Sequence, residues 1–119
     1  MNNLKIISLE NCPFSMAAED LINRIKTPES ENFNVEIHRV TQENKTEYQQ
    51  GEIKTFPQIY LNKKLVGGYD DLNEIYLEIS RIKSLDSNEK LDLMIEFLNN
   101  KVSHLERKEM LRFIKFLIG

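Results

Sequence analysis

Apolar positions alternate between two periods through the first two-thirds of the chain. Residues 4 to 9 (LKIISL) form a short, mostly apolar run, which is typical of a buried strand. From Phe14 to Ile25, apolar residues recur at i, i+3, i+4, i+7, i+8 and i+11, which predicts an amphipathic helix. Pro13 suits the first turn of this helix, and Pro28 is expected to end it because proline disfavours helical geometry in the residue before it.

A second strand and a second helix are predicted next. Residues 33 to 40 (FNVEIHRV) carry apolar side chains at alternate positions at their start, which predicts a strand with one buried face. The following segment, residues 41 to 50, is polar and is expected to form a surface helix that ends near Gly51.

Two short strands and a third helix complete this part of the chain. The runs FPQIYL (56 to 61) and KLVGG (64 to 68) predict a pair of strands with a turn around residues 62 to 64. Asp71 and Glu74 match a capping box at the start of a helix. The apolar positions of that helix have helical spacing and are Leu72, Ile75, Tyr76, Ile79 and Ile82.

The element order β-α-β-α-β-β-α over residues 1 to 83 predicts an α/β fold class. A strand-helix-strand unit makes its two strands parallel, because the crossover needs a helix, whereas a tightly linked pair of strands must be antiparallel. We therefore expect one domain, residues 1 to 83, built as a mixed four-stranded sheet flanked by helices.

Residues 84 to 119 predict a helical hairpin appended to this domain. One apolar stripe has helical spacing between Leu91 and Val102, and a second runs from Met110 to Leu117. Ser103 and Glu106 match a cap for the second helix. The two stripes either pack against the sheet or form an interface, and we favour packing.

Composition and charge narrow the class of protein. A 119-residue chain with 40% hydrophobic and 29% charged residues is typical of a globular domain. The net charge is −3 and no long Lys/Arg run occurs, so no nucleic-acid partner is expected. The apolar N-terminal run is too short for a membrane span or a signal-peptide core, so no membrane partner is expected either. A lone cysteine forms no internal disulfide, which suits a reducing compartment such as the cytoplasm.

The single cysteine, Cys12, falls between the first predicted strand and the first predicted helix. Free backbone NH groups and the positive end of the helix dipole stabilise a thiolate at such a position, so a nucleophilic thiol is physically reasonable. The alternative is that Cys12 is a small buried hydrophobic side chain. Position alone leaves both interpretations open.

Three motifs together resemble the glutaredoxin family. They are CPFS at 12 to 15, TFPQIYLN at 55 to 62 and GGYDDL at 67 to 72, in this order, and the resemblance covers about residues 3 to 83. It implies a thioredoxin-like fold, in agreement with the predicted element order. It also implies a glutathione-dependent thiol-disulfide oxidoreductase that acts on glutathionylated proteins, with glutathione as co-substrate.

By this resemblance Cys12 is the catalytic nucleophile. Ser15 stands where the two-thiol members have a second cysteine, so the resemblance implies a monothiol cycle in which glutathione itself releases Cys12. Ser15 either hydrogen-bonds the thiolate or is a neutral filler, and both alternatives stay open.

The resemblance also implies a glutathione-binding site. Pro57 matches the cis-proline of the family, which lies opposite the thiol, although a proline that merely opens an edge strand would look the same. Lys54 is expected near the glycine carboxylate of glutathione, and the start of the third helix near its γ-glutamyl end. The expected set is Phe14, Lys54, Thr55, Phe56, Pro57, Gly68, Tyr69, Asp70 and Asp71.

Some features depart from the family pattern. Glu10 places a negative charge near the thiol and no Lys closely precedes Cys12, which points to a smaller thiolate fraction, weaker glutathione affinity and weak activity. His38 and His104 lack partners at metal-ligand spacing, so no metal site is predicted. We expect both on the surface, His38 on a strand and His104 on a helix.

Two other functions are alternatives to the oxidoreductase. In the first, a homodimer carries a 2Fe-2S cluster ligated by Cys12 and glutathione, but related single-thiol proteins typically have Gly after the cysteine and a Trp-Pro pair, whereas this chain has Pro13 and no Trp. In the second, the chain is a redox-inactive interaction module. The chain is then a monomer, or a homodimer through its C-terminal helices.

Overall fold

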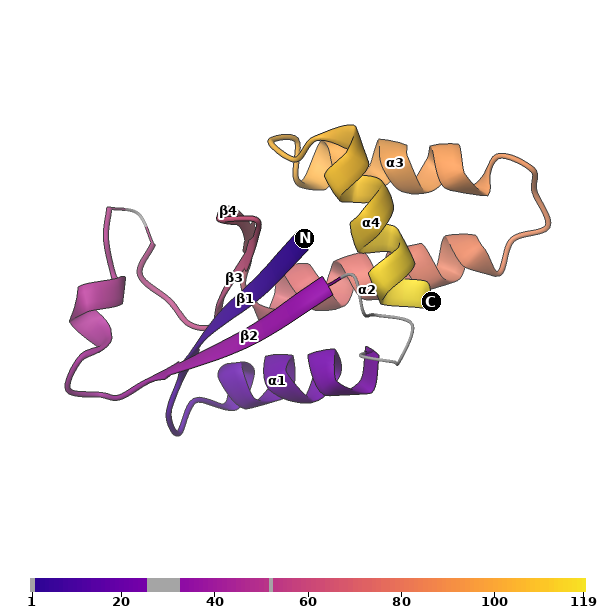
Figure 1. The fold of residues 1–119 in the computed structure, drawn as a ribbon. Coiled ribbons are helices and arrows are strands. Elements are labelled where there is room, and N and C mark those ends of the chain that lie inside the picture. The colour runs from indigo at the N-terminus through magenta and orange to yellow at the C-terminus, as the bar shows by residue number, and fades with distance from the viewer. Residues whose placement is uncertain (1, 26–32, 52) are drawn as a thin grey trace.

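The computed structural model describes residues 2–25, 33–51 and 53–119 and shows four strands, four α-helices and one 3-10 helix there (Figure 1). The elements are β1 (Asn2–Leu9), α1 (Pro13–Ile25), β2 (Phe33–Val40), η2 (Lys45–Tyr48), β3 (Gln58–Leu61), β4 (Lys64–Gly67), α2 (Tyr69–Lys83), α3 (Lys90–Lys101) and α4 (Arg107–Ile118). The end of the first helix predicted at Pro28 lies outside the described residues. Across the described ranges, no helix combines the length and apolar character needed to cross a membrane.

The strands form one four-stranded sheet in the order β2-β1-β3-β4. β1 and β2 are parallel, whereas β1 with β3 and β3 with β4 are antiparallel. The mixed sheet inferred from the element order is therefore confirmed. The β3-β4 turn places Asn62 and Lys63 at φ 50° and 69°, the left-handed region that two-residue hairpins need.

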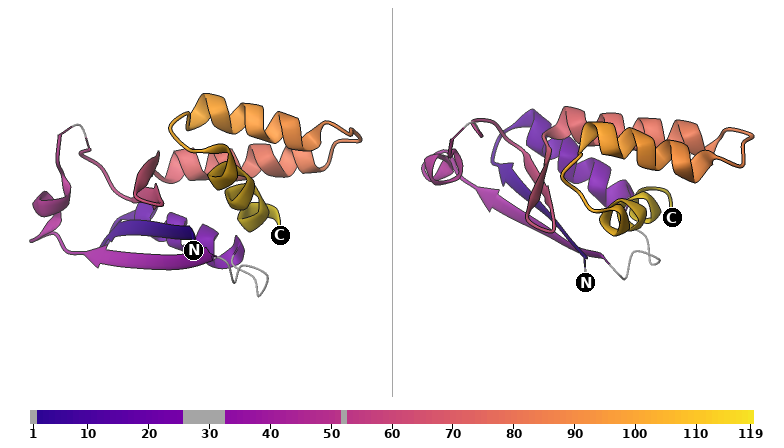
Figure 2. Two further views of the ribbon diagram at one scale, coloured as in Figure 1. Left: turned by 45° about the horizontal axis from the view of Figure 1, so that its top comes forward. Right: turned by 90° about the horizontal axis from the view of Figure 1, so that it is seen from above.

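Helices α1 and α2 pack together on one face of the sheet and bury the main core (Figures 1 and 2). Leu4 and Ile6 of β1 point to this face, where they meet α1 residues such as Ile22 and α2 residues such as Ile75, and all four side chains are fully buried. The predicted period of α1 accounts for this contact, because its apolar positions fall on one side of the helix.

The opposite face of the sheet holds a smaller apolar cluster of Ile7, Val40 and Phe56. The prediction of a helix over residues 41 to 50 is wrong. Only the short 3-10 helix η2 forms there, and none of its side chains is buried. This polar segment offers no apolar stripe to compensate the cost of helix nucleation. Thr41 and Asn44 instead bond each other's backbone NH groups with their side chains, at 2.8 and 3.2 Å, and so turn the chain.

The first turns of α2 and α4 are capped three residues away from the predicted positions. Gly68 is the N-cap of α2, and its NH donates to the Asp71 carboxylate at 2.9 Å, so Asp71 ends the capping box rather than starting it. In α4 the N-cap is Glu106, whose NH donates to Glu109 at 2.8 Å. Both errors arise because polar residues recur every three positions and so match the motif in two registers.

The C-terminal extension, residues 84 to 119, adds α3 and α4 to the side of α2. α3 runs alongside α2, and α4 runs at an angle to these two helices. Both α3 and α4 contact α2 (Figures 1 and 2). Their apolar stripes join the main core, with Phe113 fully buried and Phe116 stacked on Phe33 of β2 at 4.8 Å between ring centroids. The stripes do pack within the chain, but they pack chiefly against α2 rather than against the sheet as predicted, and Leu91 is 48% exposed. The boundary near residue 83 stays a prediction.

Polar contacts anchor the extension to the β3-β4 turn. The buried Glu109 carboxylate accepts from the Lys64 ammonium at 2.6 Å and from the Asn62 amide at 2.9 Å. Burial alone would raise the pKa of Glu109, but the Glu106 NH, Lys64 and Asn62 outweigh it and lower the pKa to about 2. His104, predicted on a helix, lies instead in the α3-α4 connection and hydrogen-bonds the Leu65 carbonyl oxygen.

The Glu109 anchor predicts acid sensitivity. Because the folded-state pKa of about 2 is below the ordinary 4.5, the stabilisation is complete above pH 4.5 and is lost as the pH falls toward 2. Glu109→Gln should lower the unfolding free energy by about 2 to 3 kcal/mol at pH 7 and remove this acid dependence. Denaturant titrations at pH 7 and pH 3 measure both effects.

The control for this experiment is Glu106→Gln. The Glu106 side chain is 59% exposed and lies 3.6 Å from the Lys108 ammonium, and the substitution leaves the backbone NH that meets Glu109 unchanged. Glutamine also keeps a side-chain oxygen for the helix cap. It should change stability by no more than ~0.5 kcal/mol. An equally steep acid loss in the wild type and in Glu109→Gln would contradict the anchor.

Candidate active site

Cys12 lies at the junction of β1 and α1, as predicted. Asn11, with φ 56°, turns the chain after β1, and asparagine tolerates this left-handed geometry. The Cys12 carbonyl accepts the first hydrogen bond of α1, from the Met16 NH at 3.0 Å, and the helix itself begins at Pro13. Cys12 is partly exposed, which does not fit a fully buried filler. Its thiol therefore has both solvent access and the helix N-terminus beside it.

The loop before β3 faces this thiol. The Phe56-Pro57 peptide bond is cis, as the resemblance implied. The Cys12 Sγ lies 3.8 Å from the Phe56 carbonyl oxygen, within the range of a weak S–H···O hydrogen bond. Pro57 does not open an edge strand, because β3 pairs with β1 on one side and β4 on the other. The thiol and the backbone before Pro57 thus share one wall of the site.

The start of α2 closes the site on its other side. The position that a Gly68 Cβ would take lies 3.7 Å from the Pro57 carbonyl oxygen, so the α2 N-terminus approaches the cis-proline loop. The rings of Phe14 and Tyr69 lie 6.4 Å apart between centroids and join α1 to α2. Phe14 is 57% exposed and offers an apolar surface beside Cys12. Six predicted residues are therefore brought together: Cys12, Phe14, Phe56, Pro57, Gly68 and Tyr69.

The Asp71 carboxylate binds the backbone at the start of α2. Its Oδ2 accepts from the Gly68 NH, and its Oδ1 lies 3.0 Å from the Lys101 ammonium. Burial would raise the pKa of Asp71, but these two partners outweigh it and hold the pKa below its ordinary value. Asp70, by contrast, is exposed.

Ser15 and Glu10 have partners other than Cys12. The buried Ser15 Oγ accepts from the Leu9 NH at 3.0 Å and so ties α1 to the end of β1. The Glu10 carboxylate accepts from the Gln42 NH at 3.0 Å. Within the described ranges, no hydrogen bond joins either side chain to the thiol.

Lys54 and Thr55 are exposed and precede the cis-proline loop. The Gln49 amide donates to the Lys54 carbonyl oxygen at 2.7 Å, which fixes the backbone of this segment to the residue after η2. Among the described residues, neither side chain makes a hydrogen bond or ion pair with the groups around Cys12. Their role in binding glutathione stays a prediction.

Lys101 is a residue near the site that sequence reasoning missed. It ends α3 and contacts Asp71 at 3.0 Å and Glu74 at 2.7 Å. The sequence carries no signal for this contact, since a basic residue in the last turn of a helix is commonplace. Only the packing of α3 on α2 brings Lys101 to the start of α2.

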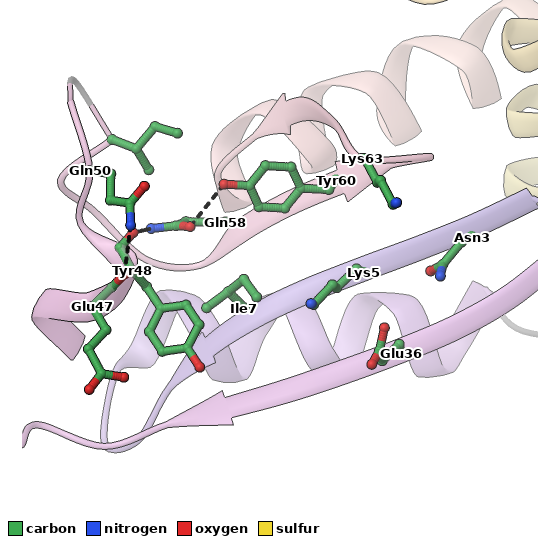
Figure 3. Close-up of a pocket in the computed structure, with 11 residues that line it drawn as sticks. Asn3, Lys5, Ile7, Glu36, Glu47, Tyr48, Gln50, Gln58, Tyr60 and Lys63 are labelled. Atoms are coloured by element: carbon green, nitrogen blue, oxygen red, sulfur yellow. Dashed lines mark hydrogen bonds between the residues drawn. The ribbon is translucent and has the colours of Figure 1, made fainter. Parts of the chain in front are cut away.

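A hollow of about 550 Å³ lies elsewhere, on the opposite face of the sheet (Figure 3). Lys5 and Ile7 of β1 and Tyr60 of β3 line it together with Tyr48, and none of the predicted site residues does. Some of its polar groups bond one another, as in the contact from the Tyr60 hydroxyl to the Gln58 side chain at 3.0 Å. Across residues 2–25, 33–51 and 53–119, no three His, Cys, Asp or Glu side chains gather as a metal-binding group.

His38 also differs from its expected environment. It was expected to face solvent, but it is half-buried and its Nε2 lies 2.7 Å from the Tyr48 hydroxyl. This hydrogen bond holds η2 against β2, so His38 has a structural contact.

A partly exposed thiol at a helix N-terminus, beside a cis-proline loop on a thioredoxin-like sheet, defines a class of thiol-dependent redox proteins. The family model for glutaredoxin matches residues 4–66, and the chain belongs to the glutaredoxin family. Among curated proteins, it is 29% identical over 92 residues to Glutaredoxin 1 of Rickettsia prowazekii (strain Madrid E), covering 76% of this chain and 94% of that protein.

A solved structure agrees with this fold. Glutaredoxin 1 from Francisella tularensis, complexed with cacodylate, superimposes with a TM-score of 0.50 at 18% identity, over 68% of this chain and 99% of that one. Membership of the family supports a glutathione-dependent thiol-disulfide oxidoreductase activity with glutathione as co-substrate. The matched region ends at residue 66, before the start of α2 and the C-terminal extension.

The turn into α2 predicts different outcomes for its two glycines. Gly67 has φ +140°, and a Cβ there would lie 2.2 Å from Asp71 Oδ2, so Gly67→Ala should displace the α2 cap and cost about 1 to 3 kcal/mol of stability. Gly68→Ala is the matched control, because Gly68 has φ −96° and a Cβ there makes only ordinary contact. It should cost less than ~1 kcal/mol. Denaturant midpoints measure both, and equal losses would contradict this account.

Proposed function

We propose that the protein is a monothiol glutaredoxin that reduces protein-glutathione mixed disulfides through Cys12. The observation that carries the proposal is the position of the partly exposed Cys12 thiol at the N-terminus of α1, 3.8 Å from the Phe56 carbonyl oxygen. Because the chain contains one cysteine, a second thiol of the same chain is unavailable to resolve an intermediate. Glutathione must therefore supply the second thiol.

In the first step, the Cys12 thiolate attacks the glutathione sulfur of the mixed disulfide. A Cys12–glutathione disulfide bond forms, the bond between glutathione and the target protein breaks, and the target leaves as a thiolate that takes a proton from solvent. The free NH groups at the start of α1 stabilise the attacking thiolate.

In the second step, the thiolate of a second glutathione attacks the glutathione sulfur bound to Cys12. Glutathione disulfide forms and Cys12 leaves as a thiolate, so the enzyme returns to its starting state. The net reaction oxidises the sulfur of the second glutathione to the disulfide level and reduces the target sulfur to a thiol, while the glutathione sulfur of the substrate remains in a disulfide.

The backbone of Phe56, beside the thiol, suits the cysteinyl residue of glutathione, whose own NH and C=O groups pair as in an added strand. Phe14 and Tyr69 supply apolar contact. The γ-glutamyl carboxylate fits the NH groups at the start of α2, and Asp70 suits its ammonium. Lys54 and Thr55 are assigned to the glycine end.

Wider properties belong to this proposal. We assign residues 1 to 83 as the glutaredoxin unit and residues 84 to 119 as its helical extension. Glutathionylated proteins in a reducing compartment such as the cytoplasm are the expected substrates. Because the extension's apolar stripes join the main core, a monomer is expected.

Cys12→Ser should reduce turnover of a glutathionylated peptide to the uncatalysed rate, because the hydroxyl is a far weaker nucleophile than a thiolate. Each turnover forms one glutathione disulfide, and a glutathione reductase couple measures the rate at which it forms. Equal rates for the wild type and Cys12→Ser would exclude the proposed mechanism. A visible absorption band and a glutathione-dependent dimer after anaerobic purification would instead support the cluster carrier.

Ser15→Ala tests the role of the fourth motif residue. Because Ser15 Oγ accepts from the Leu9 NH, the variant should lose about 1 kcal/mol of stability. Its kcat should match that of the wild type, measured at a temperature where both are folded. A loss of kcat at unchanged stability would show instead that the Ser15 hydroxyl acts on the Cys12 thiolate.

A further inference from the structure

The C-terminal extension contacts the segment that leads into the candidate site at three polar points. Lys101 pairs with Asp71 of α2, His104 bonds the Leu65 carbonyl oxygen of β4, and Glu109 pairs with Lys64. All three partners lie between the β3-β4 turn and the first turn of α2. The extension therefore holds the backbone that contains Gly67 and Gly68.

Lys101 is the contact nearest the site. Its ammonium bridges Asp71 at 3.0 Å and Glu74 at 2.7 Å, and its side chain is 25% exposed. Hydrogen bonds to Glu74 and to Asp71 raise the pKa of Lys101, so the group is a stable cation at neutral pH. Asp71 itself is held in place independently, through its other oxygen, by the Gly68 NH.

The charge of Lys101 matters because of what surrounds it. Asp70, Asp71 and Glu74 place three carboxylates in the first two turns of α2. Such carboxylates oppose the binding of an anion by the NH groups at the same helix end. Lys101 pairs with two of the three, Asp71 and Glu74, and offsets one unit of their negative charge.

We propose that Lys101 is a positioning residue for the γ-glutamyl carboxylate of glutathione, which it favours by neutralising Asp71 at the start of α2. This inference rests on the proposed function, because it concerns the same glutathione site. Lys101 lies outside residues 4–66, the region that the family model matches. The extension is then part of the glutathione site as well as part of the core.

The test removes the charge and keeps the aliphatic stem. In the full chain, Lys101→Met should raise the KM for a glutathionylated peptide about two- to fivefold at unchanged kcat, the size expected for a partly exposed ion pair. Lys101→Arg should restore the wild-type KM. Lys108→Met, which removes a charge at a side chain that is 78% exposed, is the matched control and should have no effect.

A second substrate isolates the γ-glutamyl group. The same peptide disulfide-bonded to cysteinylglycine lacks that residue, so Lys101→Met should leave its KM unchanged. An equal rise for both substrates would mean that Lys101 only stabilises the fold, and an unchanged KM for the glutathione substrate would also overturn the inference.

Binding measurements separate this inference from the proposed function. Calorimetry with S-methylglutathione on the full-length wild type and Lys101→Met reports affinity without turnover, and the variant should bind about two- to fivefold more weakly. Weaker binding by the variant, combined with no Cys12-dependent turnover, would overturn the function and leave the role of Lys101 standing. Turnover that depends on Cys12, with equal binding by both proteins, would overturn only the role of Lys101.

Discussion

The hydrogen bond from the Gly68 NH to the Asp71 carboxylate lies where the sheet, the candidate site and the C-terminal extension meet. It ends the β3-β4 hairpin by starting α2, and it requires a glycine at position 67, because any larger residue would collide with the same carboxylate. The other Asp71 oxygen faces Lys101 of α3. The turn at Gly67 and Gly68 therefore links two features of the fold: the approach of α2 to Pro57, and the packing of α3 on the start of α2.

Apolar and polar contacts have different roles in positioning the C-terminal extension on the core. Burial of Phe113 and the stacking of Phe116 on Phe33 supply non-directional stabilisation, which holds α4 on the core without choosing its exact register. The Glu109 contacts with Asn62 and Lys64 are directional, and an unpaired carboxylate at this buried position would be costly. Apolar packing thus brings the helices together, while the polar anchors determine which residues meet.

Local patterns predicted most of the secondary structure, and the reason is visible in particular elements. The apolar period of α1 is regular, and its helix starts at the predicted Pro13. The segment 41 to 50 has no such period, and there the prediction of a helix is wrong. The observed N-cap of α2 lies three residues before the predicted one, and that of α4 lies three residues after it. The residue types of a capping motif recur nearby in the sequence, so the motif matches more than one position. The actual N-cap depends on where the preceding strand or loop ends. Leu91 followed the apolar spacing and is nonetheless exposed, since spacing alone does not say how far a partner helix extends.

The sequence by itself determined the class of fold, the thiol at the start of the first helix and the three motifs that identify the family, because each depends on residues close together in the chain. Tertiary structure alone decided that Cys12 faces the Phe56 carbonyl oxygen, that Ser15 bonds Leu9, that His104 meets Leu65 and that Lys101 reaches Asp71. Each of these contacts is specified by how separate elements pack. Packing depends on the whole set of side-chain shapes at once, and no local pattern encodes it.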